Sequence, residues 1–240
     1  MIRLLDGKNL SRLEALTGES YCECRIRAMA GVYDSRHEWV RFYADDGNRT
    51  FLCFERGFAV LFCRNSLPDP DTEGLLSATA TAVLSEIPLS LPGFAEERGT
   101  VFRHTGIPAV RLEGVSSEIA EAYKILSRVF PDEVNEGCFP EWYADFSHRV
   151  RHGMSKVYTL PGKCTATLYC QENGVLFLSQ IATLEKYRRQ GLAKSLMGHI
   201  VAKNGTVLPV VLMSRSRESN AFYDHMGFIR VGSFYYYRRK

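Results

Sequence analysis

The sequence predicts an α/β protein in two parts, with a mixed central sheet flanked by helices in the C-terminal part and a smaller α+β domain before it. The chain has 240 residues, enough for two domains of ordinary size. Hydrophobic residues make up 45% of it and charged residues 24%, the proportions of a protein that folds around a core. In the second half, strand-like and helix-like runs alternate, which is the order of an α/β fold. We place the domain boundary in the polar stretch 94–107, giving domains of residues 1–105 and 106–240.

The predicted elements follow from periodicity and turn residues. Asn173-Gly174, a pair that readily adopts positive φ, marks a hairpin turn in the second half. In the first half we expect helices in two pieces over 18–44, strands over 49–54 and 58–63, and a helix over 72–86 capped by Asp71 or Thr72. In the second half we expect helices over 116–129, 140–151, 189–203 and 218–226, and strands over 157–160, 165–170, 175–183, 207–213 and 228–236.

The charge balance limits the kinds of partner. Thirty Lys and Arg residues stand against 27 Asp and Glu, a net charge of +3. This is too even for a general nucleic-acid-binding protein, but a mild basic excess suits an anionic ligand. No apolar run approaches the ~18 residues of a membrane span, and Asp6 interrupts the start before the apolar core of a signal peptide. We therefore expect a cytoplasmic protein that does not bind membranes.

The cysteines favour the same compartment. There are seven, an odd number, and no Cys-x-x-Cys pair exists. Several lie in apolar strand-like runs, as Cys53 and Cys63 do. We expect buried, reduced thiols and no metal site.

A weak internal echo suggests a duplication. The only two tryptophans each follow a glutamate, at Trp39 and Trp142, and strand-like runs end in Cys63 and Cys170 after them. The spacing to the next helix is shorter in the first half, by enough to omit one strand. A duplicated fold whose first copy lost a strand is one interpretation, and chance similarity is the other.

The segment that carries chemistry is Arg188–Ala193, where a buried strand runs through a basic turn into an apolar helix. Backbone N–H groups in the first turn of a helix lack intrahelical partners, and the helix dipole favours negative charge there. Gly191 has no side chain to block close backbone approach. The segment therefore predicts a pyrophosphate cradle. Neither a Walker loop nor a dinucleotide-binding fingerprint is present.

This segment resembles the GNAT superfamily of acyl-CoA-dependent N-acyltransferases, whose signature Arg/Gln-x-x-Gly-x-Gly/Ala is matched by Arg188–Ala193. A second run, Ser219–Phe228, resembles the family's helix that bears a Tyr and ends in Gly-Phe. The resemblance covers about residues 106–240. It implies a GNAT-like mixed sheet there and, with the echo, a degenerate GNAT-like copy in residues 1–105.

The resemblance also implies a site and a mechanism. Acetyl-CoA would lie as acyl donor between the family's fourth and fifth strands, which here are the strands expected over 175–183 and 207–213, and an amine would attack the thioester directly, without a metal. The backbone of the fourth strand would pair with the pantetheine arm, and Tyr223 would protonate the leaving thiolate. The cofactor-binding residues implied are Ile181, Ala182, Thr183, Arg188, Arg189, Gln190, Gly191, Leu192, Ala193 and Lys194.

Other aspects of the function stay open at this stage. Many relatives carry a catalytic Glu on the fourth strand, where this chain has Ser179 and Gln180. The general base is thus not identified, and a non-catalytic acyl-CoA-binding sensor is an alternative. The aromatic and basic run Phe234–Lys240 allows a nucleic-acid-associated module, although a terminal strand with a solvated tail explains it more simply. The sequence identifies neither the amine acceptor, a small molecule or a peptide, nor the oligomeric state.

Overall fold

Residues 1–33, 37–64, 67–134, 136–205 and 208–240 are described by the computed structural model. They divide into two units, each described by itself. Unit 1 comprises residues 1–102, 213–225 and 229–240, and unit 2 comprises residues 103–212 and 226–228. The division into residues 1–105 and 106–240 remains a proposal about two copies in the sequence, and its bounds differ from those of these compact units.

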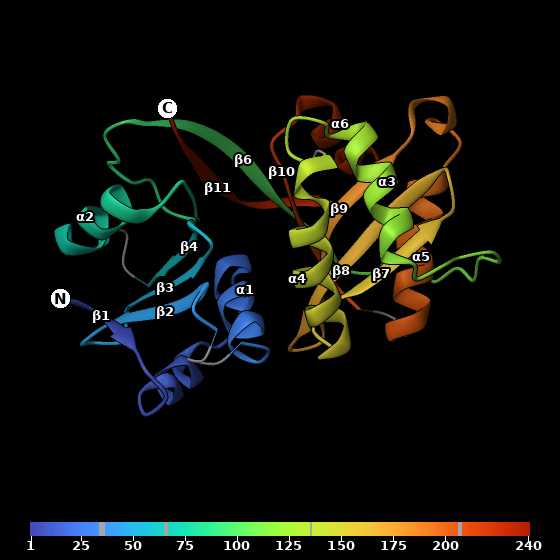
Figure 1. Ribbon diagram of the computed structural model, residues 1–240. Coiled ribbons are helices and arrows are strands. Elements are labelled where there is room, and N and C mark those ends of the chain that lie inside the picture. Colours follow the sequence, from blue (N-terminus) through green and yellow to red (C-terminus); the bar gives the residue numbers. More distant parts are fainter. Residues whose placement is uncertain (34–36, 65–66, 135, 206–207) are drawn as a thin grey trace. The chain divides into compact units, whose positions relative to one another are not determined.

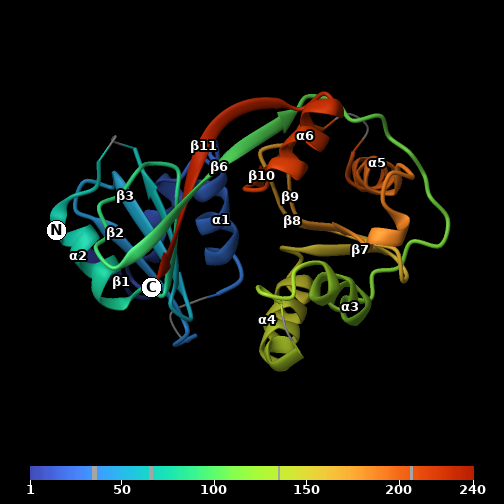
Figure 2. The ribbon, with the colours of Figure 1, turned by 90° about the horizontal axis from the view of Figure 1, so that it is seen from above.

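Unit 1 is a mixed sheet with a helix on either face. Its sheet has the order β1-β2-β3-β4-β5-β11-β6, and α1 and α2 lie on opposite faces of the strands (Figures 1 and 2). Its elements are β1 (Ile2–Leu5), η1 (Leu10–Ala15), α1 (Tyr21–Ala30), β2 (Val40–Asp45), β3 (Thr50–Glu55), β4 (Phe58–Cys63), α2 (Pro70–Thr79), β5 (Ala82–Ser85), β6 (Phe94–His104, of which the last two residues belong to unit 2), α6 (Arg217–His225) and β11 (Ile229–Arg239).

The sheet of unit 1 includes the strand that comes last in the chain. β11 pairs antiparallel with β5, with Tyr237 opposite Val83. Tyr237 and Val83 share a buried cluster with Leu76 of α2 and Leu61 of β4. The hydroxyl of Tyr237 accepts a hydrogen bond from the backbone N–H of Leu89 at 2.8 Å. The predicted terminal strand is therefore confirmed and extends to Arg239, with Tyr237 in the core, whereas the last three residues, 238–240, are exposed.

Unit 2 has the sheet order β10-β9-β8-β7, in which β7, β8 and β9 are antiparallel and β10 is parallel to β9. Helices α3 and α4 cover one face and α5 covers the other (Figure 2). Its elements are α3 (Ile119–Val129), η2 (Glu136–Cys138), α4 (Phe139–Arg151), β7 (Lys156–Leu160), β8 (Cys164–Glu172), β9 (Val175–Thr183), η3 (Glu185–Tyr187), α5 (Leu192–Asn204) and β10 (Val210–Ser214, of which the last two residues belong to unit 1).

The core beneath α3 and α4 holds the end of β9 in place. Ala182 and Leu184 pack with Ile125 of α3 in a buried cluster that Trp142 of α4 also contacts. The ring of Trp142 is stacked on that of Phe146, with centroids 4.9 Å apart. The end of β9, which leads to the basic turn, is thus packed against a buried apolar cluster.

Several predicted elements are confirmed, among them the strands at 58–63 and 175–183. Four segments of the first half are strands that were not predicted from the sequence, among them residues 2–5, to which no element was assigned. Residues 40–45 lie in a segment assigned to a helix, residues 82–85 were assigned to the end of the helix 72–86, and residues 94–104 were taken as an irregular boundary. The N-cap of α2 is Asp69 and not Asp71 or Thr72.

The prediction that the first copy of the duplicated fold lost one strand is also wrong. Each unit has three antiparallel strands, then a helix, then a strand parallel to the third: β2-β3-β4-α2-β5 in unit 1 and β7-β8-β9-α5-β10 in unit 2. Cys63 ends the third strand of the first series, whereas Cys170 lies in the second strand of the other. The two cysteines do not occupy equivalent positions, and the apparently missing strand is β2.

Candidate functional site

A β-bulge interrupts β9 at Gln180, three residues before the strand ends at Thr183. Gln180 has a φ of 50°, unusual for a residue with a side chain. The pairing with β8 shifts at this point, since Thr165 lies opposite Ala182 whereas Thr167 lies opposite Ser179. One extra residue on one strand, with a local kink, is what defines a bulge.

The bulge changes the side of β9 to which the backbone N–H group of a given alternate residue points. The N–H of Leu176 donates to the carbonyl of Pro209, just before β10, at 2.9 Å, whereas the N–H of Leu184 donates to Lys163 beside β8 at 2.9 Å. An uninterrupted strand would direct both N–H groups to the same side, because peptide groups alternate with a period of two. The peptide of Ala182 therefore faces β8, and those of Ile181 and Thr183 face the opposite edge.

That opposite edge is where β9 and β10 part. Their parallel pairing joins Leu176–Phe177 to Val210–Val211, and β9 continues to Thr183 beyond it. An extended strand edge can take an added strand-like molecule through main-chain hydrogen bonds. The geometry thus offers the backbone of Ile181 and Thr183 to an extended ligand.

The turn after β9 opens onto the N-terminus of α5. Arg189 has a φ of 64°, and Gly191, the N-cap, has a φ of 76°. No side chain caps this end of α5, and no acidic residue lies in its described first turn. A Cβ built on Gly191 would meet no atom within 4 Å, so space is open there. The first N–H groups of the helix are consequently directed at an open, positively polarised mouth.

The side chains around the mouth add positive charge. Arg188, Arg189 and Gln190 are exposed, and Lys194 is exposed one turn into the helix. Nε of Arg188 donates to the carbonyl oxygen of Thr183 at 3.3 Å, which ties the turn to the end of β9. Such a mouth attracts a phosphate or pyrophosphate group.

All ten predicted cofactor-binding residues lie on this one stretch of unit 2, from the end of β9 into α5. They are Ile181, Ala182, Thr183, Arg188, Arg189, Gln190, Gly191, Leu192, Ala193 and Lys194. The sequence analysis did not anticipate the bulge at Gln180, and glutamine carries no sequence signal for positive φ.

Tyr223, the predicted acid, lies in α6 and is assigned to unit 1. It is buried against the rings of Phe102 and Phe222, with centroid distances of 5.4 and 5.3 Å. Burial raises the pKa of Tyr223 well above its ordinary value. A phenol of ordinary pKa is already protonated at neutral pH, and this shift extends the protonated range further into alkaline pH.

Gln180 on β9 and two histidines at the C-terminal end of α4 are further polar groups of unit 2. Oε1 of Gln180 lies 3.1 Å from the hydroxyl of Thr167, which donates to it. On α4, the rings of His148 and His152 lie 4.3 Å apart, and His152 is exposed. Gln180 is thus the polar side chain at the bulge itself, held in place by a buried threonine.

Comparison with known proteins identifies a family domain within part of the chain. The family model described as "Acetyltransferase (GNAT) domain" matches residues 153–230, which include the bulge, the turn and α5. Residues 153–230 are a GNAT domain. A search of curated proteins finds no match.

Solved structures extend the likeness beyond the GNAT domain. A tandem GNAT protein from the clavulanic acid biosynthesis pathway is 12% identical, with a TM-score of 0.60 over 99% of this chain and 97% of its own. A Drosophila protein is 12% identical, with a TM-score of 0.64 over 100% and 98%. A GCN5-related N-acetyltransferase from Sphaerobacter thermophilus is 14% identical, with a TM-score of 0.59 over 99% and 94%. The predicted fold is confirmed, with two GNAT-like parts in one chain.

Two further observations concern the whole of the described chain. Its His, Cys, Asp and Glu side chains form no group of three or more that could hold a metal ion. None of its helices combines the length and apolar character needed to cross a membrane.

Proposed function

We propose that this protein transfers an acyl group, most simply acetyl, from acetyl-CoA to a primary amine by direct attack. One observation carries the proposal: the parted edge of β9 leads into an uncapped, cation-flanked helix N-terminus. An extended arm that ends in a diphosphate matches both features, and CoA has that form.

Binding would divide between backbone and side chains. The peptides of Ile181 and Thr183 would pair with the pantetheine arm, and Ala182, whose peptide faces β8, would contribute its small side chain. The N–H groups from Arg189 to Lys194 would bind the pyrophosphate, with the guanidinium of Arg188 beside them.

The chemistry requires a neutral amine, a polarised thioester and a protonated leaving group. The amine nitrogen forms a bond to the acyl carbon, the carbon–sulfur bond breaks, and the sulfur leaves with the electron pair. Tyr223, whose phenol is protonated at neutral pH, would give its proton to that thiolate and then regain one from water. The attacking amine releases its own proton to water, and Gln180 would help to orient that water.

The alternative function is a non-catalytic acyl-CoA sensor. It is favoured by one observation, which is that an amide, Gln180, and no carboxylate, stands at the bulge of β9. The choice between the two functions does not depend on whether the acceptor is a peptide or a small molecule.

A thiol-release assay with acetyl-CoA against a broad library of primary amines separates the two. Transferase activity predicts acceptor-dependent release of CoA that saturates with the amine. Tight CoA binding without release on any amine would favour the sensor.

We also propose a cytoplasmic location, supported by the seven cysteines, all of which are unbridged.

A further inference from the structure

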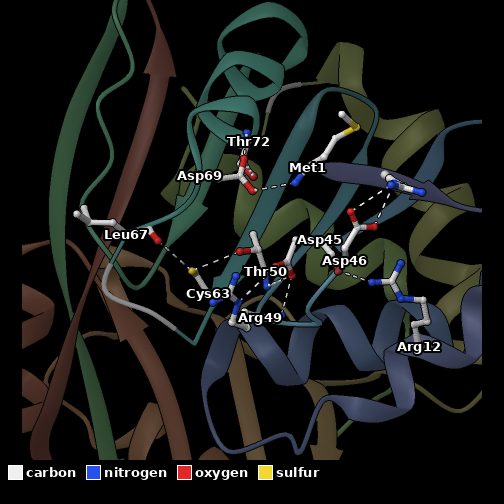
Figure 3. Close-up of polar contacts among 11 residues, drawn as sticks. Met1, Arg12, Asp45, Asp46, Arg49, Thr50, Cys63, Leu67, Asp69 and Thr72 are labelled. Atoms are coloured by element: carbon white, nitrogen blue, oxygen red, sulfur yellow. Dashed lines mark hydrogen bonds and ion pairs between the residues drawn. The ribbon is translucent and has the colours of Figure 1, made fainter.

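Unit 1 has its own counterpart of the CoA-binding helix mouth. Helix α2 follows the third antiparallel strand β4 and precedes the parallel strand β5, as α5 follows β9 and precedes β10. The N-terminus of α2 therefore occupies, within unit 1, the topological place of the α5 N-terminus in unit 2. Figure 3 shows the residues around it.

A carboxylate of the chain itself fills this mouth. Oδ1 of Asp69 accepts hydrogen bonds from the backbone N–H of Thr72 at 2.8 Å and from its hydroxyl at 3.1 Å (Figure 3). Pro70, in the first turn, has no N–H to offer a ligand. Among the first residues of α2, Pro70 has no N–H, and the N–H groups of Thr72 and Glu73 already have oxygen acceptors on Asp69.

The side chains at this mouth are acidic, whereas those at the α5 mouth are basic, and the one cation beside Asp69 in Figure 3 is the N-terminal ammonium of Met1, 4.0 Å from Oδ2. Asp69 is the N-cap, and Asp71 and Glu73 lie in the first turn of α2. The first turn of α5 has no acidic residue, and Arg188 and Arg189 precede it. A pyrophosphate approaching α2 would meet three carboxylates, and like charges repel.

The strands beside α2 leave a shorter free edge. β4 and β5 pair continuously from Phe58 opposite Ala82 to Leu61 opposite Ser85. The register of β4 with β3 is unbroken from Phe58 to Cys63, and none of these residues has a positive φ. β4 runs only two residues beyond this pairing, to Cys63, whereas β9 runs six residues beyond its pairing with β10, so unit 1 offers a much shorter strand edge to a pantetheine arm.

Beyond the end of β4, the chain folds back on itself. The thiol of Cys63 lies 3.5 Å from the hydroxyl of Thr50 and donates to the carbonyl oxygen of Leu67 at 3.7 Å (Figure 3). This contact holds Leu67, just before Asp69, close to the strand end.

We propose that the chain binds a single acyl-CoA, in unit 2, and that in unit 1 the carboxylate of Asp69 takes the place that a phosphate would occupy at the equivalent helix. The proposal rests on the proposed function for its CoA site in unit 2. Unit 1 would then serve the reaction without its own acyl donor.

Titration of the full chain with CoA, followed by calorimetry and native mass spectrometry, tests this proposal. One CoA per chain is expected. The Gly191→Ala variant should weaken that single binding event about tenfold or more and leave no tighter site behind. Asp69→Asn keeps an N-capping side chain, so its stoichiometry and affinity should match those of the unaltered chain within about twofold.

Two CoA molecules per chain, or a site that survives Gly191→Ala and changes in Asp69→Asn, would overturn the single-site proposal and leave the proposed function standing. An unaltered chain that binds no CoA would overturn the proposed function itself. Thermal unfolding of each variant, compared with that of the unaltered chain, shows that it is folded under the conditions of the titration.

Discussion

Nε of Arg239 donates to the carbonyl oxygen of Ala80 at 3.0 Å, across 159 residues of sequence. Nη2 of the same guanidinium donates to Ala80 and to the carbonyl of Ser77, and its carbon lies 4.8 Å from the centre of the Phe94 ring. Ser77 and Ala80 lie at the C-terminal end of α2, where carbonyl groups lack intrahelical donors and a cation is favourable. Arg239 thus caps a helix of unit 1 from the far end of the chain.

Replacing Arg239 by alanine should destabilise unit 1. Loss of a cationic cap with several hydrogen bonds to carbonyls is expected to lower the free energy of unfolding by about 1 kcal/mol. Chemical denaturation followed by circular dichroism measures it. Lys240→Ala removes a neighbouring exposed charge while keeping the backbone hydrogen bond of residue 240 to Gly93. Equal effects of the two substitutions would show that the cap contributes nothing specific.

Gly191→Ala should affect binding more than stability. Its φ of 76° disfavours alanine by about 1 kcal/mol, but the added Cβ would meet no protein atom within 4 Å. Gly162, between β7 and β8, has a φ of 66° and equally open surroundings, so Gly162→Ala is a matched control. Calorimetry should find weaker CoA binding for Gly191→Ala only, with similar melting temperatures for both. Weakening by Gly162→Ala to the same extent would refute a cradle at residue 191.

Tyr223→Phe should lower kcat by about tenfold or more and leave the KM for acetyl-CoA nearly unchanged, because the hydroxyl acts on the leaving thiolate. The raised pKa of Tyr223 also predicts that one pH effect is absent. Since the phenol keeps its proton throughout the neutral and mildly alkaline range, its ionisation should produce no loss of activity there. Steady-state kinetics from pH 6 to 9 check both points. An unaltered kcat in Tyr223→Phe would remove this residue from the mechanism.

Asp45 should make the stability of unit 1 dependent on pH. Burial alone would raise the pKa of Asp45, but backbone N–H groups of Thr50, Arg49 and Gly47 outweigh it and hold the pKa below its usual value. Two of these hydrogen bonds, from Arg49 and Thr50, are 2.7 Å long. Because the folded pKa is the lower one, the stabilisation is present above the unfolded pKa of about 3.9 and is lost as the pH falls through the folded pKa.

The Asp45→Asn variant tests that dependence. It should lower the free energy of unfolding by about 1 kcal/mol at neutral pH, and the difference from the unaltered chain should shrink below about pH 4. Denaturation at a series of pH values measures it. A difference that stays constant down to pH 3 would contradict the assignment to the Asp45 charge.

Two glycines of unit 1 should respond to alanine in opposite directions. A Cβ on Gly99 would lie 2.2 Å from the ring of Phe234 and 2.8 Å from the carbonyl oxygen of Ser214, so Gly99→Ala should cost about 2 kcal/mol. Gly74 lies in α2 with no atom within 4 Å of such a Cβ, so Gly74→Ala should stabilise by about 0.5 kcal/mol. Denaturation midpoints that shift in the same direction for both would contradict this.

The elements predicted well from the sequence are those with a strong local signal. Val175–Thr183 starts with four consecutive apolar residues directly after an Asn-Gly turn, and the structure has the strand with those bounds. The basic turn before α5 also has a local signal, since the glycine in it, Gly191, is the N-cap of α5. Local patterns were enough to identify the stretch that carries the candidate site.

The strands that were missed depend on distant partners. Phe94–His104 exposes four consecutive side chains, Ala95–Arg98, and becomes a strand because it pairs with β11 from the other end of the sequence. Ala82–Ser85 is only four residues long and follows α2 closely. Gln180 adopts its positive φ through the register of β8 against β9, which no local property of glutamine encodes. Long-range pairing is what the sequence patterns do not contain.

The place of β11 between β5 and β6 has a consequence for biosynthesis. When the ribosome has delivered β1 to β6, the sheet of unit 1 still lacks the strand that separates its last two members. The nascent first half must therefore wait, with the edge of β5 uncovered, until translation reaches residues 229–239. Unit 1 starts first in synthesis and can finish folding only with the final residues of β11.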